Sequence, residues 1–196
     1  MDHLRSNMAE LSRAKFLYTT GFFIDANFEA VKAICEFATA NDKPLGFNLS
    51  ALFVVQFYLD QVKETLKHAE YVFCNEDEGA AIATALGLEA SDRVGAAKKI
   101  ATMEKTTTTR PRTVIVTMGA EPTIVVTGLP GEEPTVEYIE VAQIESSLIT
   151  DTNGAGDSFC GAFFASLSSG SDLRTAVTKG NELAGKVIQK SGCVFE

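Results

Sequence analysis

The sequence predicts an α/β fold in which helices cover both faces of a largely parallel sheet. Short runs rich in β-branched and aromatic residues alternate with longer segments whose apolar residues recur at helical spacing. The chain has 196 residues, enough to bury a substantial core, and no linker divides it, so we expect a single α/β domain over residues 1–196. In sheets of this kind ligands bind beyond the carboxyl ends of the strands, so the turns after strands are where a site is expected.

Strands and helices alternate in the first half of the chain. The expected helices carry apolar residues at every third or fourth position, and Asp92 is expected to cap the last of them, which runs to about residue 103. The expected elements are strands at residues 16–20, 44–48 and 71–74, and helices at about residues 27–40, 58–68 and from Asn75 to just before Gly87.

The second half begins with a polar segment, residues 105–112, which we expect to be a solvated surface loop. Gly119 and Pro122 are expected to form the turn between the next two strands. The expected elements are strands at residues 113–117, 123–127 and 137–141, and helices at residues 157–168 and about 173–190.

Composition limits the classes of function. Hydrophobic residues make up 45% of the chain and charged residues 22%, as in soluble globular proteins. A net charge of −9 argues against nucleic acid or an anionic membrane as the main partner. The cysteines Cys35, Cys74, Cys160 and Cys193 are widely spaced in apolar surroundings, which is typical of buried free thiols in a reducing compartment, and we expect a cytoplasmic protein.

The most informative segment is Asp151-Thr152-Asn153-Gly154-Ala155-Gly156-Asp157, a glycine-rich turn that leads directly into an apolar helical segment. Glycines permit positive φ and let a phosphate approach the backbone closely. The N–H groups of Gly154, Ala155 and Gly156 are expected to be free at the helix start, where they can bind an anion. Asp157 fits a base that receives a proton from an acceptor hydroxyl, although an aspartate at a helix start is also a common cap. The turn therefore predicts a phosphoryl-transfer site.

Polar and aromatic residues near the ends of other strands are further candidates. Asn75 and Glu78 follow the strand at residues 71–74 and offer oxygen ligands for magnesium; alternatively, the acidic residues there only favour the helix dipole. Thr117 and Gly119 alone indicate no more than a strand-to-turn transition. Phe53 is expected at a strand-to-loop exit, where it either belongs to the core or stacks on a planar ligand.

Taken together, these motifs resemble those of the ribokinase-type (PfkB) carbohydrate and nucleoside kinases. Residues 151–157 match the family signature Asp-Thr-x-Gly-Ala-Gly-Asp at every fixed position, and Asn75-x-x-Glu78 matches its second motif in the expected order. Within the family, Thr20-Gly21-Phe22-Phe23, Phe47-Asn48-Leu49-Ser50-Ala51-x-Phe53 and Gly192-Cys193-Val194-Phe195 resemble the adenosine kinases. The resemblance is to the C-terminal part of those enzymes, and it implies a ribokinase-like fold whose N-terminal part and lid are missing.

The resemblance also implies ATP and Mg²⁺ as cofactors and adenosine as the acceptor, with ADP and AMP as products in purine salvage. It implies small-molecule partners, neither nucleic acid nor membrane, and a complete enzyme that is monomeric. The implied roles are Asp157 as base for the 5′-hydroxyl, Gly154, Ala155 and Gly156 as the anion hole, Asn75 and Glu78 as magnesium-positioning residues, Phe53 as the adenine stacker, and Thr117, Gly119, Asn153 and Asn181 along the ATP site.

Some positions depart from the family pattern. Leu52 stands where proline is usual, Asn181 replaces a histidine that is common there, and Lys15 lies near the position of an expected arginine. Two alternatives stay open: a sugar kinase of the same family, which would not need an aromatic residue at Phe53, and a catalytically inactive nucleotide-binding fragment.

Overall fold

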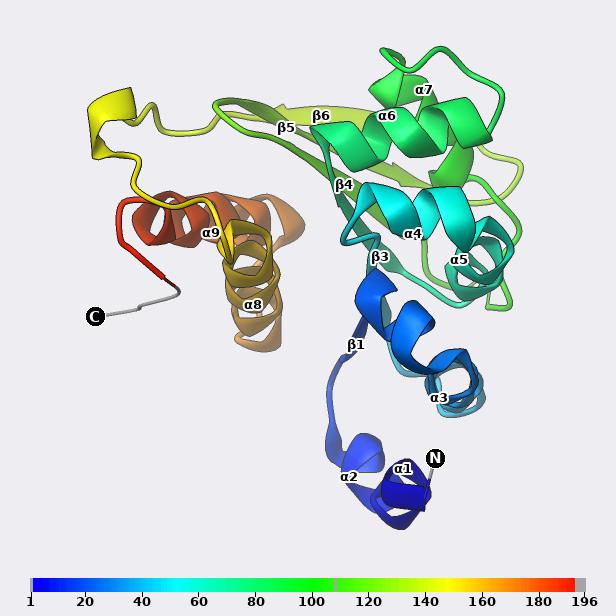
Figure 1. The fold of residues 1–196 in the computed structure, drawn as a ribbon. Coiled ribbons are helices and arrows are strands. Elements are labelled where there is room, and N and C mark those ends of the chain that lie inside the picture. Colours follow the sequence, from blue (N-terminus) through cyan, green and yellow to red (C-terminus); the bar gives the residue numbers. More distant parts are fainter. Residues whose placement is uncertain (1, 108, 193–196) are drawn as a thin grey trace. The chain divides into compact units, whose positions relative to one another are not determined.

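A computed structural model describes residues 2–107 and 109–192 (Figure 1). Its strands form a six-stranded sheet in the order β1-β2-β3-β4-β5-β6. The pairs from β1 to β4 are parallel, whereas the short turn at Gly119-Ala120 between β4 and β5 requires an antiparallel pair. This mixed, mostly parallel sheet confirms the predicted α/β class. The strands are β1 (Leu17–Thr20), β2 (Leu45–Asn48), β3 (Tyr71–Asn75), β4 (Arg112–Met118), β5 (Glu121–Gly128) and β6 (Thr135–Ile139).

The helices are α1 (Asp2–Ser6), α2 (Met8–Arg13), α3 (Gly21–Ala40), α4 (Leu52–Phe57), α5 (Leu59–Leu66), α6 (Glu76–Ala85), α7 (Arg93–Ala101), the 3₁₀ helix η1 (Ser146–Leu148), α8 (Ala155–Ser168) and α9 (Leu173–Val187). The helices α3 to α7 lie between successive strands from β1 to β4, as the alternating pattern predicted.

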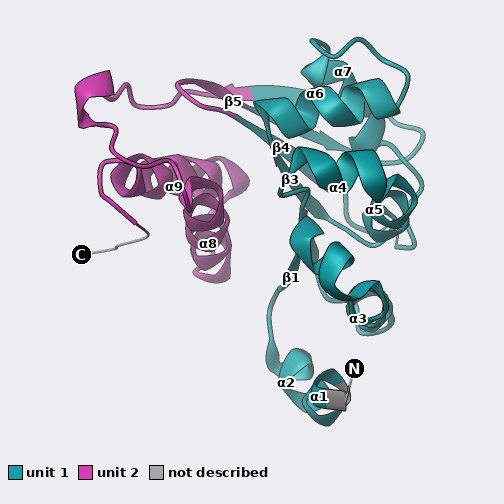
Figure 2. Ribbon diagram, viewed as in Figure 1, with its two compact units in different colours: residues 1–117, 124–137 teal, residues 118–123, 138–196 magenta. Residues whose placement is uncertain are grey.

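The chain divides into two compact units, coloured separately in Figure 2. Unit 1 consists of Met1–Thr117 and Ile124–Glu137, and unit 2 of Met118–Thr123 and Tyr138–Glu196. In unit 1, α3 packs on β1 and β2, α6 packs on β3, and contacts among α3, α4, α5, α6 and α7 connect these helices. Fully buried side chains such as Phe47, Val72 and Val114 form its core.

Unit 2 is built on the packing of α8 against α9. Gly180 of α9 makes the close crossing possible, because a Cβ at this position would lie 2.7 Å from the ring of Phe159 on α8. Phe159 and Phe163 are buried on the same face of α8, with their rings stacked 6.4 Å apart. The absence of a side chain at Gly180 therefore sets the distance between the helices.

Several helical segments were not predicted: α1, α2, η1, the first part of α3 and all of α4. α3 begins at Gly21, and its non-helical residue Asn27 (φ −167°) marks a kink where we expected the helix to start. Asn27 Oδ1 accepts a hydrogen bond of 3.1 Å from the N–H of Ala30, so it does cap the second part of α3. α4 was missed altogether, and Phe53 lies in its first turn instead of in a loop. Six residues are too few to show a helical period.

Residues 105–112 are only partly the solvated loop that we expected: Thr106, Thr109 and Pro111 are exposed, whereas Lys105 and Arg112 are buried. The side chain of Lys105 is 1% exposed and its Nζ lies 3.6 Å from Oε1 of Glu70, which is also buried. Arg110 joins the same carboxylate through its Nε at 2.5 Å. Pro122, expected in a turn, lies in β5.

Arg112, the first residue of β4, lies in the interior with 1% exposure. Its guanidinium donates to the carbonyl oxygens of Leu66 and Ala69, near the end of α5, at 2.7 and 3.1 Å. It also donates to those of Ile100, Met103 and Glu104, at the end of α7, at 2.5, 3.0 and 3.2 Å. Carbonyl groups at helix ends carry partial negative charge, so they partner the buried cation well. Burial lowers the pKa of Arg112 to about 10.

The prediction of buried free thiols is confirmed for the three cysteines that the structure describes. Cys35, Cys74 and Cys160 are free and buried, while Cys193 lies outside the described residues. Burial, reinforced by the nearby Glu64, raises the pKa of Cys35 to about 12, so this thiol stays protonated at neutral pH.

Candidate functional site

The glycine turn at residues 151–157 forms the start of α8 in unit 2. Gly154 is the N-cap and has φ +77°, a left-handed conformation that glycine adopts without strain. Among the described residues, no hydrogen-bond acceptor serves the N–H groups of Gly154, Gly156 and Asp157. A Cβ at Gly156 would meet no atom within 4 Å, so the space beside this turn is open. The turn therefore presents free donors at a helix N-terminus, as an anion site requires.

The free donors differ from the predicted ones at two residues, because Asp157 is among them and Ala155 is not. The N–H of Ala155, predicted to be free, donates to the carbonyl oxygen of Thr152 at 3.3 Å. Asp157 is exposed, whereas the next residues along α8, Ser158 and Phe159, are buried. Its carboxylate thus stands beside the free N–H groups on the solvent side of the helix. Asn153 is exposed in the same turn.

Asn75 and Glu78 form a capping box at the start of α6 in unit 1. Asn75 Oδ1 accepts hydrogen bonds from the N–H groups of Asp77 and Glu78 at 3.0 and 2.8 Å, and Glu78 Oε2 accepts from the N–H of Asn75 at 3.1 Å. Both residues thus have a structural role at the start of α6, whether or not they also hold a metal ion. The capping box uses one oxygen of Glu78, and among the described residues its second oxygen, Oε1, makes no hydrogen bond.

The burial and the carboxyl pKa of Glu78 decide how this residue could hold a metal ion. The residue is 5% exposed, and this burial raises the pKa of its carboxyl group, an effect that the N–H of Asn75 partly offsets. In the described part of the chain, no cluster of three or more histidine, cysteine, aspartate or glutamate side chains is arranged to hold a metal ion. The residues present fit a Mg²⁺ ion held by one carboxylate with water and substrate phosphates, which is how proteins commonly hold this ion.

Thr117 lies beside Asn75, because the parallel register of β3 and β4 pairs these two residues. Its hydroxyl donates to the carbonyl oxygen of Cys74 at 3.4 Å. The structure thus brings Asn75, Glu78 and Thr117 together at the carboxyl edge of the sheet in unit 1, where the sequence predicted a site.

Gly119 and Asn181 belong to unit 2. Gly119 has φ +60° in the turn between β4 and β5. Asn181 on α9 accepts a hydrogen bond of 3.0 Å from the hydroxyl of Thr123, at the start of β5. Its Nδ2 is buried without a partner in the described part of the chain. An unpartnered buried donor is costly, so this amide is a candidate for binding a ligand acceptor atom.

Phe53 lies next to a second aromatic residue that sequence analysis did not select. The rings of Phe53 and Phe22 have centroids 6.1 Å apart, and Phe22 is 55% exposed. Gly21 permits this approach: its N–H donates to Ser50 Oγ at 3.1 Å, and a Cβ there would lie 2.2 Å from the carbonyl oxygen of Leu49. The Gly21-Phe22-Phe23 motif was the signal that could have identified Phe22.

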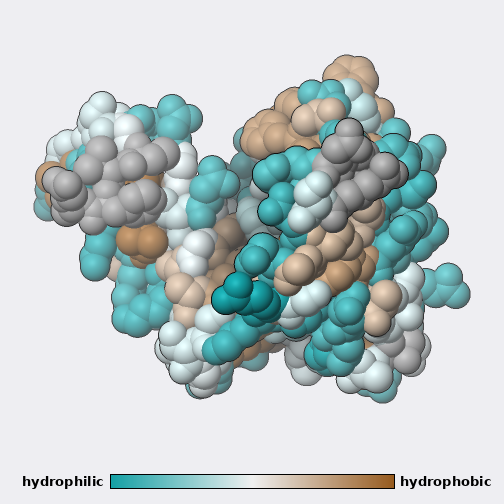
Figure 3. All heavy atoms as spheres, turned by 90° about the horizontal axis from the view of Figure 1, so that it is seen from below, coloured by the Kyte–Doolittle hydropathy of each residue, from teal (hydrophilic) through white to brown (hydrophobic). Residues whose placement is uncertain are grey.

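Other large hydrophobic side chains also remain in contact with solvent. They include Phe23 and Leu52, which are 37% and 43% exposed, and Phe57, which is 76% exposed. Hydrophobic areas, coloured brown, lie among hydrophilic, teal ones on the face that Figure 3 shows. Among the described residues, no helix combines the length and the apolar character needed to cross a membrane.

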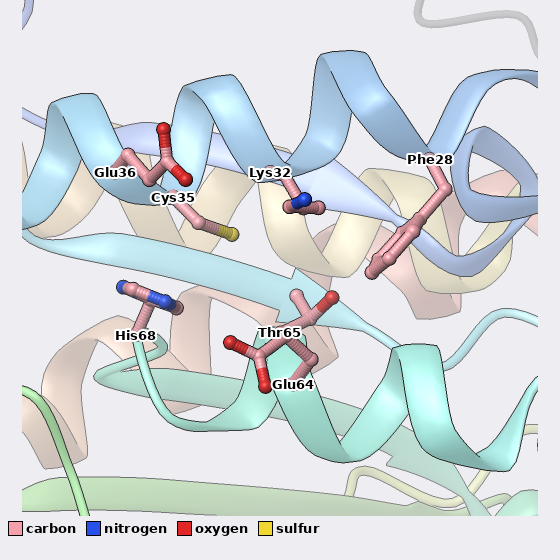
Figure 4. A pocket seen from close by; sticks show the side chains of 7 residues that line it. All are labelled: Phe28, Lys32, Cys35, Glu36, Glu64, Thr65 and His68. Carbon is pink, nitrogen blue, oxygen red and sulfur yellow. The ribbon is translucent and has the colours of Figure 1, made fainter.

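A small pocket lies between α3 and the end of α5 in unit 1, apart from every predicted site residue (Figure 4). His68 Nδ1 is 2.7 Å from the hydroxyl of Thr39, and burial lowers the pKa of the imidazole. Lys32 projects between the two helices. The pocket is lined by Phe28, Lys32, Cys35, Glu36, Glu64, Thr65 and His68.

The chain is similar to known kinases along its whole length. The pfkB family carbohydrate kinase model matches residues 1–196. Adenosine kinase 2 of Arabidopsis thaliana is 35% identical over 197 residues, an alignment that covers 100% of this chain and 56% of the plant protein. Adenosine kinase of Saccharomyces cerevisiae is 35% identical over 193 residues, which cover 97% of this chain and 54% of the yeast protein.

Solved structures of adenosine kinases are also similar to this chain. Anopheles gambiae adenosine kinase in complex with P1,P4-di(adenosine-5) tetraphosphate matches with a TM-score of 0.91 at 34% identity, covering 98% of this chain and 56% of that one. Schistosoma mansoni adenosine kinase in complex with adenosine and AMP matches with a TM-score of 0.88 at 29% identity, covering 100% of this chain and 57% of that one. The fold is therefore ribokinase-like, and the chain spans little more than half the length of these relatives.

Proposed function

Because the chain belongs to the pfkB family of carbohydrate kinases, we propose that it carries the phosphate-binding and catalytic part of an adenosine kinase. The reaction would transfer the γ-phosphoryl group of ATP to the 5′-hydroxyl of adenosine. The observation that carries this proposal is the start of α8, where N–H groups without acceptors stand beside the exposed carboxylate of Asp157. The relatives' complexes with adenosine, AMP and a dinucleoside tetraphosphate support the choice of ligands.

In the proposed step, the 5′-oxygen forms a bond to the γ-phosphorus while the bond from that phosphorus to the β,γ-bridging oxygen breaks. The proton of the hydroxyl passes to the carboxylate of Asp157, and ADP leaves with the electron pair of the broken bond. The N–H groups of Gly154, Gly156 and Asp157 would donate to the oxygens of the transferred group, whose charge is spread in a loose transition state. A base that accepts the proton late is sufficient for such a step.

Other residues would bind and orient the nucleotide. Asn75 and Glu78 would hold Mg²⁺ through its water shell, where the ion supplies charge neutralisation for the phosphates. Gly119, Thr117, Asn153 and Asn181 would line the ATP site, with the unpartnered Nδ2 of Asn181 as a donor.

A sugar kinase of the same family is the second candidate. The aromatic pair of Phe22 and Phe53 favours a nucleoside, because a planar base can stack on such rings whereas a sugar has no need of them. A third possibility is a nucleotide-binding protein that transfers no phosphate. We further propose a cytoplasmic enzyme that is monomeric when complete and whose partners are small molecules.

Binding of Mg·ATP tests the phosphate site directly. Calorimetric titration should give a Kd that rises at least about tenfold in Gly154→Val, because a β-branched residue cannot adopt the left-handed conformation without strain. Gly170→Val is the matched control: Gly170 also has a positive φ (+90°), just past the other end of α8, and has open space around it. Equal Kd values in the two variants would contradict the assignment.

Asp157→Asn tests the base. Phosphoryl transfer should fall by about 10²–10⁴-fold while Mg·ATP binding stays within about threefold. Asp60→Asn is the control, because Asp60 is also exposed and lies in the first turn of a helix, α5, where its charge favours the helix dipole. This variant should keep the rate of phosphoryl transfer. Retained turnover in Asp157→Asn would remove Asp157 from the mechanism, and binding without any transfer by the unaltered chain would favour the inactive alternative.

A further inference from the structure

The residues just before the glycine turn are attached to the end of α9. The N–H groups of Thr150 and Asp151 both donate to the carbonyl oxygen of Ile188, at 2.8 and 3.2 Å. The hydroxyl of Thr150 adds a bond of 3.4 Å to the carbonyl oxygen of Gln189. The approach to the turn is therefore fixed by backbone atoms at the C-terminal end of a helix distant in sequence.

The carboxylate of Asp151 extends this attachment to the segment that follows α9. Oδ1 accepts a hydrogen bond of 2.9 Å from the N–H of Asn153, inside the turn. Oδ2 accepts one of 3.2 Å from the N–H of Gly192. One side chain thus uses its two oxygens to join the glycine turn to residues 189–192.

These bonds hold the carboxylate in its ionised form. The N–H groups of Asn153 and Gly192 lower the pKa of Asp151, so both oxygens are acceptors throughout the neutral range. Bonds of an N–H group to a charged acceptor are about twice as strong as those between neutral groups. Asp151 is therefore suited to hold a turn that contains the flexible residues Gly154 and Gly156.

The direction of the free donors depends on this turn. The N–H group of Gly154 points where the backbone between Asp151 and α8 directs it, and the positive φ of Gly154 is one of many conformations open to glycine. The N–H group of Gly156 lies in the first turn of α8, which begins directly after this backbone. α8 itself is held against α9 by the contact of Phe159 with Gly180. The turn is thus restrained on both sides by α9 and the residues after it.

We propose that Asp151 is a positioning residue, which aligns the phosphate-binding N–H groups by coupling the glycine turn to residues 189–192. This inference rests on the proposed function for its catalytic consequence, but the coupling itself is a property of the chain without ligand. It gives the segment after α9 a part in catalysis, although that segment contributes no atom to the reacting groups.

Amide hydrogen exchange of the unliganded chain tests the coupling. Asp151→Ala should speed exchange at Asn153 and Gly192 by at least about tenfold, because both amides lose their acceptor. Asp151→Asn keeps one carbonyl oxygen, so one of these amides should remain slow.

The matched control is Asp172→Ala: Asp172 also accepts a backbone bond, from Thr175 at 2.7 Å, but it caps the opposite end of α9. That variant should speed exchange at Thr175 and leave the turn unchanged. Unchanged exchange at Asn153 and Gly192 in Asp151→Ala would overturn the proposal.

Kinetics then separates positioning from simple stabilisation. In Asp151→Ala, kcat should fall by about 10–100-fold with a smaller change in the Kd for Mg·ATP, since misdirected donors cost most in the transition state. Asp151→Asn should recover part of the loss, and Asp172→Ala should keep the kcat of the unaltered chain.

A kcat that falls equally in both alanine variants, in proportion to their loss of thermal stability, would overturn the positioning role. A chain that binds no Mg·ATP while its exchange follows the pattern above would refute the proposed function and leave the coupling established.

Discussion

Lys105 and Glu70 form an ion pair that is almost sealed from water, with side chains 1% and 4% exposed. Arg110 contacts the same carboxylate and also pairs with the exposed Asp42, and Arg112 lies close enough to repel Lys105. Burial lowers the pKa of Lys105 from its ordinary 10.5 to about 8, an effect that Glu70 partly opposes. With Arg110 still in place, Glu70 keeps a cationic partner when Lys105 loses its proton.

This lowered pKa predicts an unusual dependence of stability on pH. Below about pH 8 Lys105 is protonated in both the folded and the unfolded chain, and above 10.5 it is neutral in both. Between these values the unfolded chain binds more protons, so the Lys105 contribution to the free energy of unfolding rises with pH. Urea unfolding at pH 7 and pH 9.5 should show the unaltered chain gaining stability relative to Lys105→Met. A difference that stays constant or shrinks would contradict the shift.

Phe53 predicts a difference between acceptors. If adenosine stacks on this ring, Phe53→Ala should raise the KM for adenosine about tenfold or more, since stacking of a base on an aromatic side chain contributes about 1–3 kcal/mol. Phe57→Ala, at the other end of α4 and 76% exposed, should leave the KM unchanged. Initial rates with adenosine and with ribose measure both effects, and equal losses on the two acceptors would undercut the nucleoside assignment.

At the scale of elements, two helices of unit 1 begin with comparable caps. Asn75 caps α6 and Asp92 caps α7, each accepting backbone bonds through its side chain. Asn75→Ala and Asp92→Ala should therefore each lower the free energy of unfolding by about 1 kcal/mol. The proposed metal role adds a second effect for Asn75 alone: the Mg²⁺ concentration for half-maximal activity should rise about tenfold. A parallel rise in Asp92→Ala would assign it to lost stability.

The crossing of α8 and α9 gives a second prediction at this scale. Gly180→Ala should destabilise the chain by about 1–3 kcal/mol, because the added Cβ meets the ring of Phe159. Gly161→Ala lies in α8 with nothing within 4 Å of its Cβ, and it should stabilise by about 0.5–1 kcal/mol through helix propensity. Thermal unfolding followed by circular dichroism distinguishes the two. Equal shifts in both variants would show that the close crossing is not maintained in solution.

For the whole molecule, the sequence was informative where local pattern decides the structure. The buried strands β3 and β4 are apolar runs bounded by turn residues, and they lie within two residues of their predicted bounds. The cap at Asp92 was equally predictable, because capping depends on neighbours a few residues away. The glycine turn was found for the same reason.

The features that the sequence did not predict depend on contacts with residues elsewhere in the chain. Lys105 and Arg110 have the composition of a surface loop, and only their contacts with Glu70, 40 residues before Arg110, show that Lys105 is buried and Arg110 half-buried. α4 is too short for a helical period and is held by its packing on α6. Ala155 could not be distinguished from its neighbours, since its bond to Thr152 depends on how the turn closes.

Arg112 has a consequence for the order in which unit 1 can assemble. Its guanidinium reaches the carbonyl oxygen of Leu66, 46 positions earlier, and that of Ile100, 12 positions earlier. While a ribosome has not yet released residue 112, the carbonyl oxygen of Leu66 lacks this donor, and that of Ile100 has only backbone N–H groups of the same helix end, such as that of Met103 at 3.2 Å. Once Arg112 is released, its guanidinium can donate hydrogen bonds to the carbonyl oxygens at both helix ends at the same time. Unit 1 is thus expected to become stable late during synthesis and in a single step, and a nascent chain stopped before Arg112 should remain open to proteolysis.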